Sequence, residues 1–121
     1  KLILYPWGHK YDGIEIVKDQ AVHKKMAEKM ATWNGYAPQQ SSELYIASGD
    51  TTDWSYGEHK IISFTFELDP SSSGFGGGGF YPGASQIQPS FDKNLEPMLY
   101  LTEYADNPYR VLNVGIGPIN P

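Results

Sequence analysis

One segment of the sequence, residues 61–68, alternates its side chains with the period of a β-strand. One face of this predicted strand carries Ile62, Phe64, Phe66 and Leu68. The other face carries Ile61, Ser63, Thr65 and Glu67. A strand with so apolar a face has to be covered by other elements, so the segment predicts a sheet that packs against helices.

Glu67 stands on the more polar face of that strand, at its carboxyl end. Open α/β sheets collect ligands and reactive groups at the carboxyl ends of their strands. The carboxylate is therefore a candidate general base. A carboxylate on the rim of the sheet, paired with a lysine, is the simpler interpretation, and position alone leaves both open.

The remaining segments predict the order strand, helix, extended piece, strand, helix. Leu2–Tyr5 is a short apolar strand, Asp19–Trp33 is a helix, and Glu43–Asp53 is an extended piece followed by a loop. The last helix is expected over Lys93–Tyr104. This order predicts an α/β fold with helices against a sheet.

Both predicted helices carry an apolar stripe. In the first, Asp19 is a plausible N-cap and Asn34-Gly35 a stop signal. Its expected core residues are Val22, Met26, Met30 and Trp33, at spacings of four, four and three. The expected core stripe of the last helix is Leu95, Met98, Leu99, Leu101 and Thr102.

Composition excludes several classes of function. The 121 residues suit one domain, and their net charge of -5 argues against a nucleic-acid partner. No apolar run is long enough for a membrane helix. The chain has no cysteine, and His9, His23 and His59 lack the spacing of a zinc site. We expect all three histidines at the solvated surface.

Neither a dinucleotide-binding motif nor a serine-hydrolase motif is present in the context that its function requires. The run 74–79 fits G-x-G-x-x-G, but Phe80-Tyr81-Pro82 follows it instead of a helix. The glycine-rich segment 71–79 is predicted to be a flexible surface loop. No G-x-S-x-G nucleophile motif occurs.

Tyr45 precedes a Gly49-Asp50 turn, and could be a packing residue or a mobile ring that reaches a ligand. Asp50 is by default a turn former that bonds local backbone.

Four separate motifs nevertheless stand in one order: LILYPWG, LYIASGDTTDWSYG, FTFEL and GFYP, which begin at Leu2, Leu44, Phe64 and Gly79. Together they closely resemble the C-terminal third of the zinc metallocarboxypeptidases of the carboxypeptidase A/B type, and most of all the bacterial secreted branch of carboxypeptidase T type. The resemblance covers Lys1 to about Tyr109, and it implies the C-terminal part of that family's mixed sheet flanked by helices. Residues 110–121 then form an extended tail or linker.

The resemblance assigns roles to five residues. Glu67 matches the general base that activates water and passes its proton to the leaving amine, and Tyr45 matches a mobile tyrosine that closes over the substrate. Asp50 and Thr52 match positions that line the pocket for the C-terminal side chain, and Phe80 matches an aromatic near the preceding substrate residue. With a neutral Thr52 and an acidic Asp50, the resemblance implies mixed specificity for apolar and basic C-terminal residues.

The family's zinc ligands and carboxylate-binding arginine belong to an N-terminal portion that this sequence lacks, one ligand being a His a few residues before the opening strand. The resemblance therefore implies zinc in the intact parent and no metal ligand in this chain, which we expect to be inactive alone. The expected partners are peptide or protein C-termini and the missing N-terminal half of the domain, with neither nucleic acid nor membrane. The parent is expected to be secreted. The alternative is a non-catalytic module that binds peptides or complements a partner.

Overall fold

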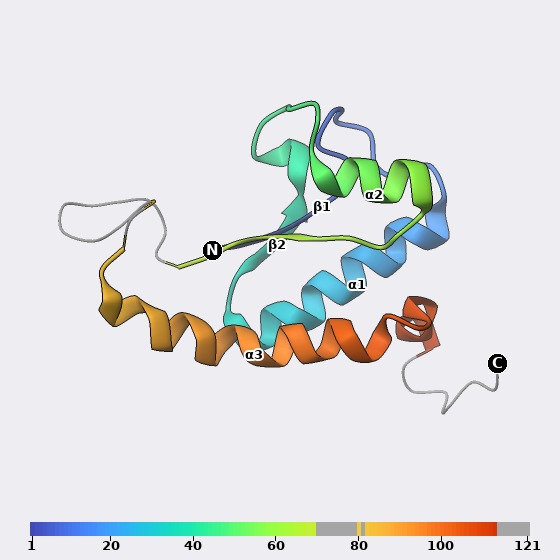
Figure 1. The fold of residues 1–121 in the computed structure, drawn as a ribbon. Coiled ribbons are helices and arrows are strands. Elements are labelled where there is room, and N and C mark those ends of the chain that lie inside the picture. The colour runs from blue at the N-terminus through green and yellow to red at the C-terminus, as the bar shows by residue number, and fades with distance from the viewer. Residues whose placement is uncertain (70–79, 81, 114–121) are drawn as a thin grey trace.

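The computed structural model describes residues 1–69, 80 and 82–113, and shows a mixed α/β fold (Figure 1). The elements, in chain order, are β1 Leu2–Tyr5, α1 Val17–Asn34, β2 Ala37–Gln40, the 3₁₀ turn η1 Ser41–Glu43, α2 Thr51–His59, β3 Thr65–Glu67, the 3₁₀ turn η2 Ala84–Gln86, α3 Ile87–Tyr104 and the 3₁₀ segment η3 Pro108–Asn113. The predicted fold class, a small mixed sheet flanked by helices, is confirmed. Within the described ranges, no helix is both long enough and apolar enough to cross a bilayer.

The sheet has three strands in the order β2-β1-β3. β1 pairs in parallel with β2, so that Tyr5 lies opposite Gln40, and antiparallel with β3. In the antiparallel pair Leu2 lies opposite Glu67. The carboxyl end of β3 therefore lies beside the amino end of the central strand.

The main core lies between the sheet and α1. Ile3 and Tyr5 of β1 pack with Val22, Met26 and Met30 of α1, all of them buried. α1 also contacts α3, so the layers run from the sheet through α1 to α3 (Figure 1).

The approach to β3 adds its predicted apolar face to this core. Ile62, Phe64 and Phe66 pack against the main cluster as expected. Leu68 does not, because β3 ends at Glu67 and the Leu68 side chain is 54% exposed.

α1 extends beyond the predicted helix by two residues at its start and by one at its end. Gly35 ends the helix in the left-handed conformation, with φ 71° and its N–H bonded to the carbonyl of Ala31. The start was wrong: the N-cap position is Ile16, and Asp19 is buried inside the first turn. Trp33 is 36% exposed and packs edge-on against Tyr100.

Thr51–His59 form helix α2, which begins inside the loop predicted at the end of Glu43–Asp53. Asp50 is its N-cap, and the carboxylate accepts the N–H of Thr52 at 2.7 Å. The local bonding expected of Asp50 is thus present, but it starts a helix rather than closing a turn.

Helix α3 begins six residues before the predicted start at Lys93, and it buries a different face from the one predicted. Its buried side chains are Asn94, Pro97 and Tyr100. Of the predicted stripe, Leu101 is partly buried, whereas Leu95, Met98 and Leu99 are exposed.

The end of the described chain packs on α1 through η3, where Val111 is 2% exposed. Residues 110–113, predicted as part of an extended tail, therefore belong to the folded body. The predicted glycine-rich loop at 71–79 and the rest of the tail lie outside the described residues.

His23 is fully buried, contrary to the expectation of a surface histidine. Its Nε2 accepts the N–H of Ser63 at 3.2 Å, so Nδ1 carries the proton and donates to the carbonyl of Asp19 at 2.8 Å. Burial lowers the pKa of His23, and it outweighs the opposing effect of Asp19. The neutral imidazole thus ties the segment that enters β3 to α1.

This histidine should make the fold less stable in mild acid. Because the pKa of His23 is lower in the folded state, the unfolded chain binds more protons below about pH 6.5, and stability falls as the pH drops through that value. We expect the midpoint of urea unfolding to decrease between about pH 7.5 and about pH 5.5. The slope should largely vanish in His23→Gln, and a flat profile for the unsubstituted chain would contradict this account.

Candidate functional site

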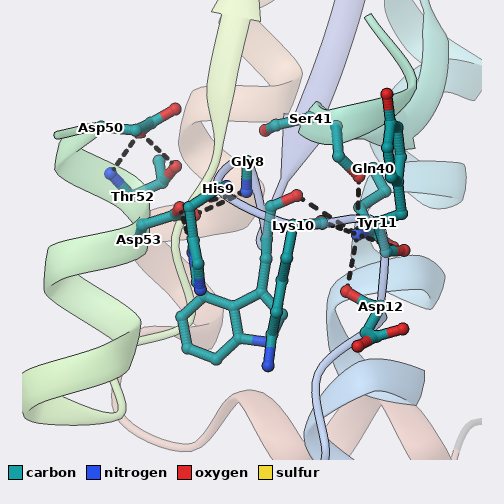
Figure 2. Close-up of polar contacts among 12 residues, drawn as sticks. Gly8, His9, Lys10, Tyr11, Asp12, Gln40, Ser41, Asp50, Thr52 and Asp53 are labelled. Carbon is teal, nitrogen blue, oxygen red and sulfur yellow. Dashed lines mark hydrogen bonds and ion pairs between the residues drawn. The ribbon is translucent and has the colours of Figure 1, made fainter. Parts of the chain in front are cut away.

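The loop that leaves β1 is held by the first turn of α2 (Figure 2). The Asp53 carboxylate accepts the N–H of Gly8 at 2.9 Å, the N–H of His9 at 3.0 Å and Nδ1 of His9 at 2.8 Å. These bonds join residues 44 or 45 positions apart and fix the backbone of Gly8 against the helix.

Gln40, at the end of β2, holds the other side of the same loop (Figure 2). Its Nε2 donates to the carbonyl of Asp12 at 2.9 Å and to Oγ of Ser42 at 2.8 Å, and also lies 3.2 Å from the carbonyl of Trp7. The Ser42 N–H bonds that Trp7 carbonyl as well. Side chains on both sides thus pre-form the loop.

Asp50 and Thr52 lie together at the start of α2, as the resemblance requires of two pocket residues (Figure 2). Oδ1 of Asp50 accepts the N–H of Thr52 at 2.7 Å and its hydroxyl at 2.6 Å. Thr52 is only 5% exposed, so its hydroxyl serves the aspartate. Oδ2 of Asp50 faces Gly8, where a Cβ would stand 3.4 Å from it.

Asp50 borders an open cleft of about 730 Å³, whereas Thr52 is not part of its lining. Its lining includes Trp7, His9, Asp50, Asp53, Trp54 and Glu58. Three carboxylates and two indole rings suit a ligand that carries both positive charge and apolar surface.

Glu67 lies away from this cleft, at the opposite end of β1. Its side chain is exposed, and among the described residues it takes part in no hydrogen bond or ion pair. Glu67 lies on the rim of the sheet, as the simpler interpretation held, but no lysine pairs with it among the described residues. The ion pairs go instead to Asp69, from Lys93 at 2.6 Å and from Lys1 at 3.6 Å.

Asp69 anchors the chain directly after Glu67. Its side chain is 6% exposed, and Tyr36 donates its hydroxyl to Oδ2 at 3.3 Å. Burial alone would raise the pKa of Asp69, but the hydrogen bond and charge of Lys93, with Lys1 and Tyr36, lower it below its ordinary value. The cluster ties β3 to α3 and to the start of β1.

Tyr45 and Phe80, the remaining candidates, are solvent-exposed. Tyr45 is 66% exposed in the segment between η1 and α2, and Phe80 is fully exposed. No hydrogen bond within the described part of the chain joins either residue to Asp50, Thr52 or Glu67. The structure thus brings together only the Asp50–Thr52 pair.

The resemblance places the zinc ligands outside this sequence, and the described residues offer no other metal site. In 1–69, 80 and 82–113, no three side chains of His, Asp or Glu gather closely enough to hold a metal ion. His9 has Asp53 beside it, and both ring nitrogens of His23 are already bonded within the fold.

Local sequence patterns did not predict the contacts that hold the loop beside the cleft, which involve Gly8, Gln40 and Asp53. One available signal was the pattern Asp50-Thr51-Thr52-Asp53, because a capping residue followed three positions later by an acid marks a helix start. It would have predicted α2 and placed Asp53 in its first turn. The contacts of Gly8 and Gln40 cross 28 or more positions, and no local pattern signals them.

The sequence matches one known protein family. A family model described as zinc carboxypeptidase matches residues 1–97. A zinc carboxypeptidase of Saccharothrix mutabilis subsp. capreolus is 35% identical over 93% of this chain and 26% of its own length. Carboxypeptidase B of Bos taurus is 33% identical over 87% of the chain and 25% of its own length, and carboxypeptidase A1 of Homo sapiens 34% identical over 90% and 26%.

The chain thus spans about a quarter of the length of the curated relatives that it matches. The matched family model covers all three strands and the first half of α3, including every residue of the cleft. On this match, the chain belongs to the zinc carboxypeptidase family.

Proposed function

We propose that this chain is the C-terminal portion of a secreted, zinc-dependent carboxypeptidase that removes C-terminal amino acids from peptides. The observation that carries the proposal is the register of β1 and β3, which puts Glu67 opposite Leu2. In the resemblance described above, a zinc-binding His precedes this strand by a few residues. A residue a few positions before Leu2 would therefore lie near Glu67, at the same end of the sheet.

In this proposal Glu67 is the general base. Its carboxylate accepts a proton from the water that attacks the peptide bond and passes that proton to the leaving amine. The exposed position and the lack of a described ionic partner leave both carboxylate oxygens available for this transfer. The neighbouring Asp69 cluster fixes the backbone beyond it.

The cleft at Asp50 would receive the C-terminal side chain of the substrate. Oδ1 of Asp50 is occupied by Thr52, whereas Oδ2 takes part in no hydrogen bond within the described residues, and a cationic side chain in the cleft could pair with it. The two indole rings of the lining would accept apolar side chains. Mixed specificity for apolar and basic residues follows.

Asp50→Asn tests this assignment. An amide oxygen can still accept the Thr52 N–H and cap α2, so the change removes the charge and keeps the helix. We expect kcat/KM of the longer enzyme to fall about tenfold for peptides that end in Arg and to change little for peptides that end in Leu. Glu28→Gln, at an exposed glutamate of α1 outside the cleft lining, is the matched control. Equal losses on both peptides would contradict the role of Asp50.

The described residues cannot assemble the metal site by themselves, and so we expect no activity from the 121 residues alone. The chain, with zinc added, should release no amino acid from peptides ending in Leu or Arg. A longer chain of the same gene, or this chain mixed with its upstream half, should release it. Turnover by the 121 residues alone would overturn the proposal. Saturable peptide binding by the longer chain without turnover would instead favour a non-catalytic peptide-binding module.

A further inference from the structure

Glu67, the proposed general base, lies at the end of the edge strand of the described sheet. β3 pairs with β1, where Glu67 lies opposite Leu2, and with no other strand in residues 1–69, 80 and 82–113. No described side chain bonds the Glu67 carboxylate, so the backbone of β3 decides where that carboxylate lies. Contacts that hold this backbone therefore bear directly on the proposed reaction.

The side chain of Tyr36 contacts the chain on both sides of Glu67. Its ring packs edge-on against the ring of Phe66, the residue before Glu67, with 6.5 Å between the ring centroids. Its hydroxyl accepts the N–H of Asp69, which follows Glu67 by two residues, at 3.2 Å. One side chain thus restrains both ends of the segment that carries Glu67.

The Tyr36 hydroxyl uses all of its hydrogen-bonding capacity. A phenol offers one donor and two acceptor positions. This hydroxyl donates to Oδ2 of Asp69 at 3.3 Å, and it accepts the Asp69 N–H and, at 3.0 Å, Nδ2 of Asn94. Because Tyr36 is only 3% exposed, removal of the hydroxyl would leave these buried donors without an acceptor.

Two buried asparagines fix Tyr36 in turn. Asn34, the last residue of α1, accepts the Tyr36 N–H on Oδ1 at 2.9 Å and donates from Nδ2 to Oδ1 of Asn94 at 3.1 Å. Asn94 lies in α3, and its Nδ2 also donates to the carbonyl of Ser90 at 2.9 Å. The phenol is therefore placed by two helices, and the end of β3 takes its position from them through Tyr36.

We propose that Tyr36 is a positioning residue for Glu67, whose ring and hydroxyl hold the end of β3 where the Glu67 carboxylate can accept the proton of the attacking water. This inference rests on the proposed function, because it takes Glu67 as the general base. Tyr36 acts only through the backbone of residues 66–69, since its hydroxyl is committed to Asp69 and Asn94. A displacement of about 1 Å can lower a rate by about 10², so a weaker hold on this segment should lower kcat.

Tyr36→Phe tests the proposal, because it keeps the ring against Phe66 and removes the hydroxyl. We expect kcat of the longer enzyme on a peptide that ends in Leu to fall about tenfold and KM to change by less than about twofold. Tyr109→Phe is the matched control. It also removes a phenol hydroxyl that bonds an aspartate, near the start of α1 rather than after its end, and it should keep both kcat and KM.

The effect of Tyr36→Phe should pass entirely through Glu67. In the Glu67→Gln background, adding Tyr36→Phe should leave the residual rate unchanged within about twofold. A general loss of structure would lower the rate by the same factor in both backgrounds, and that result would overturn the inference.

Hydrogen exchange gives a measurement that does not depend on activity. Exchange at the Asp69 amide, followed by NMR in the longer chain, should be at least about tenfold faster in Tyr36→Phe, because that amide loses its acceptor. Unchanged exchange at Asp69 would also overturn the inference.

If Tyr36→Phe does not fold, Phe66→Leu provides a second variant, which removes the ring contact and keeps an apolar side chain against the core. The same fall in kcat with little change in KM is expected. Unchanged kcat in these variants, beside a slow Glu67→Gln enzyme, would overturn the inference and leave the proposed function standing. Wild-type kcat in Glu67→Gln, or a longer chain without peptidase activity, would instead contradict the proposed function.

Discussion

Glu67→Gln should lower kcat of the longer enzyme by a factor of about 10² to 10⁴, the range that general-base catalysis contributes. The amide cannot accept the proton of the attacking water, although it has nearly the same shape as the carboxylate. KM should change far less than kcat, because Glu67 acts on the reacting atoms rather than on the substrate side chain. The measurement is steady-state hydrolysis of a peptide that ends in Leu.

The same substitution should leave folding intact. Glu67 is exposed and has no described hydrogen-bond partner, so we expect the free energy of unfolding to change by less than about 0.5 kcal/mol. Glu43→Gln, at an equally exposed glutamate in η1, is the matched control and should keep full activity. Wild-type kcat in Glu67→Gln would remove Glu67 from the reaction.

Asp19→Ala should destabilise the fold by about 3 kcal/mol, a large share of the stability of a domain of this size. Asp19 is 3% exposed and accepts two phenol hydroxyls, from Tyr56 at 2.5 Å and from Tyr109 at 2.6 Å. Burial, and then the hydrogen bond with Asp19, raises the pKa of Tyr56, which therefore remains a donor at neutral pH. The truncation would leave two donors without an acceptor near the centre of the fold.

Denaturant unfolding of four variants would measure this effect. Tyr56→Phe and Tyr109→Phe each remove one donor and should cost about 1 kcal/mol apiece, less than the loss of the shared acceptor. Asp12→Ala removes an exposed carboxylate and should be close to neutral. A cost for Asp19→Ala similar to that of Asp12→Ala would show that the two tyrosine bonds contribute little.

Local patterns predicted those features of the fold that depend on near neighbours. The alternation at 62–66 predicted which side of β3 faces the core, and Gly35 predicted where α1 ends. The predicted start at Lys93 was six residues late, and Pro89 lies in the first turn of α3, where proline is tolerated. Asp50 was correctly expected to bond local backbone, but the helix that it starts was not recognised.

Burial of polar groups could not be predicted from local patterns, because it depends on partners far along the chain. Asp19 is buried together with Tyr109, a hydrogen-bond partner 90 positions away. His23 is buried against the backbone of Ser63, its partner 40 positions away. The rotation of α3 has the same origin: Asn94 is buried because it bonds Tyr36 and Asn34. For the site, the family resemblance named Asp50 and Thr52, but only the structure showed that Gly8 and Asp53 shape the space beside them.

The position of β1 in the middle of the sheet affects how the chain can fold during synthesis. β1 leaves the ribosome before both of its partners, and its pairing with β3 waits until residues 65–67 have been made. Until β3 has been made, the apolar residues of β1 have no neighbouring strand on that edge. Closing the long loop between β1 and β3 also carries an entropic cost. We expect nascent chains that stop before β3 to be captured by chaperones, whereas those that extend through α3 should resist proteolysis.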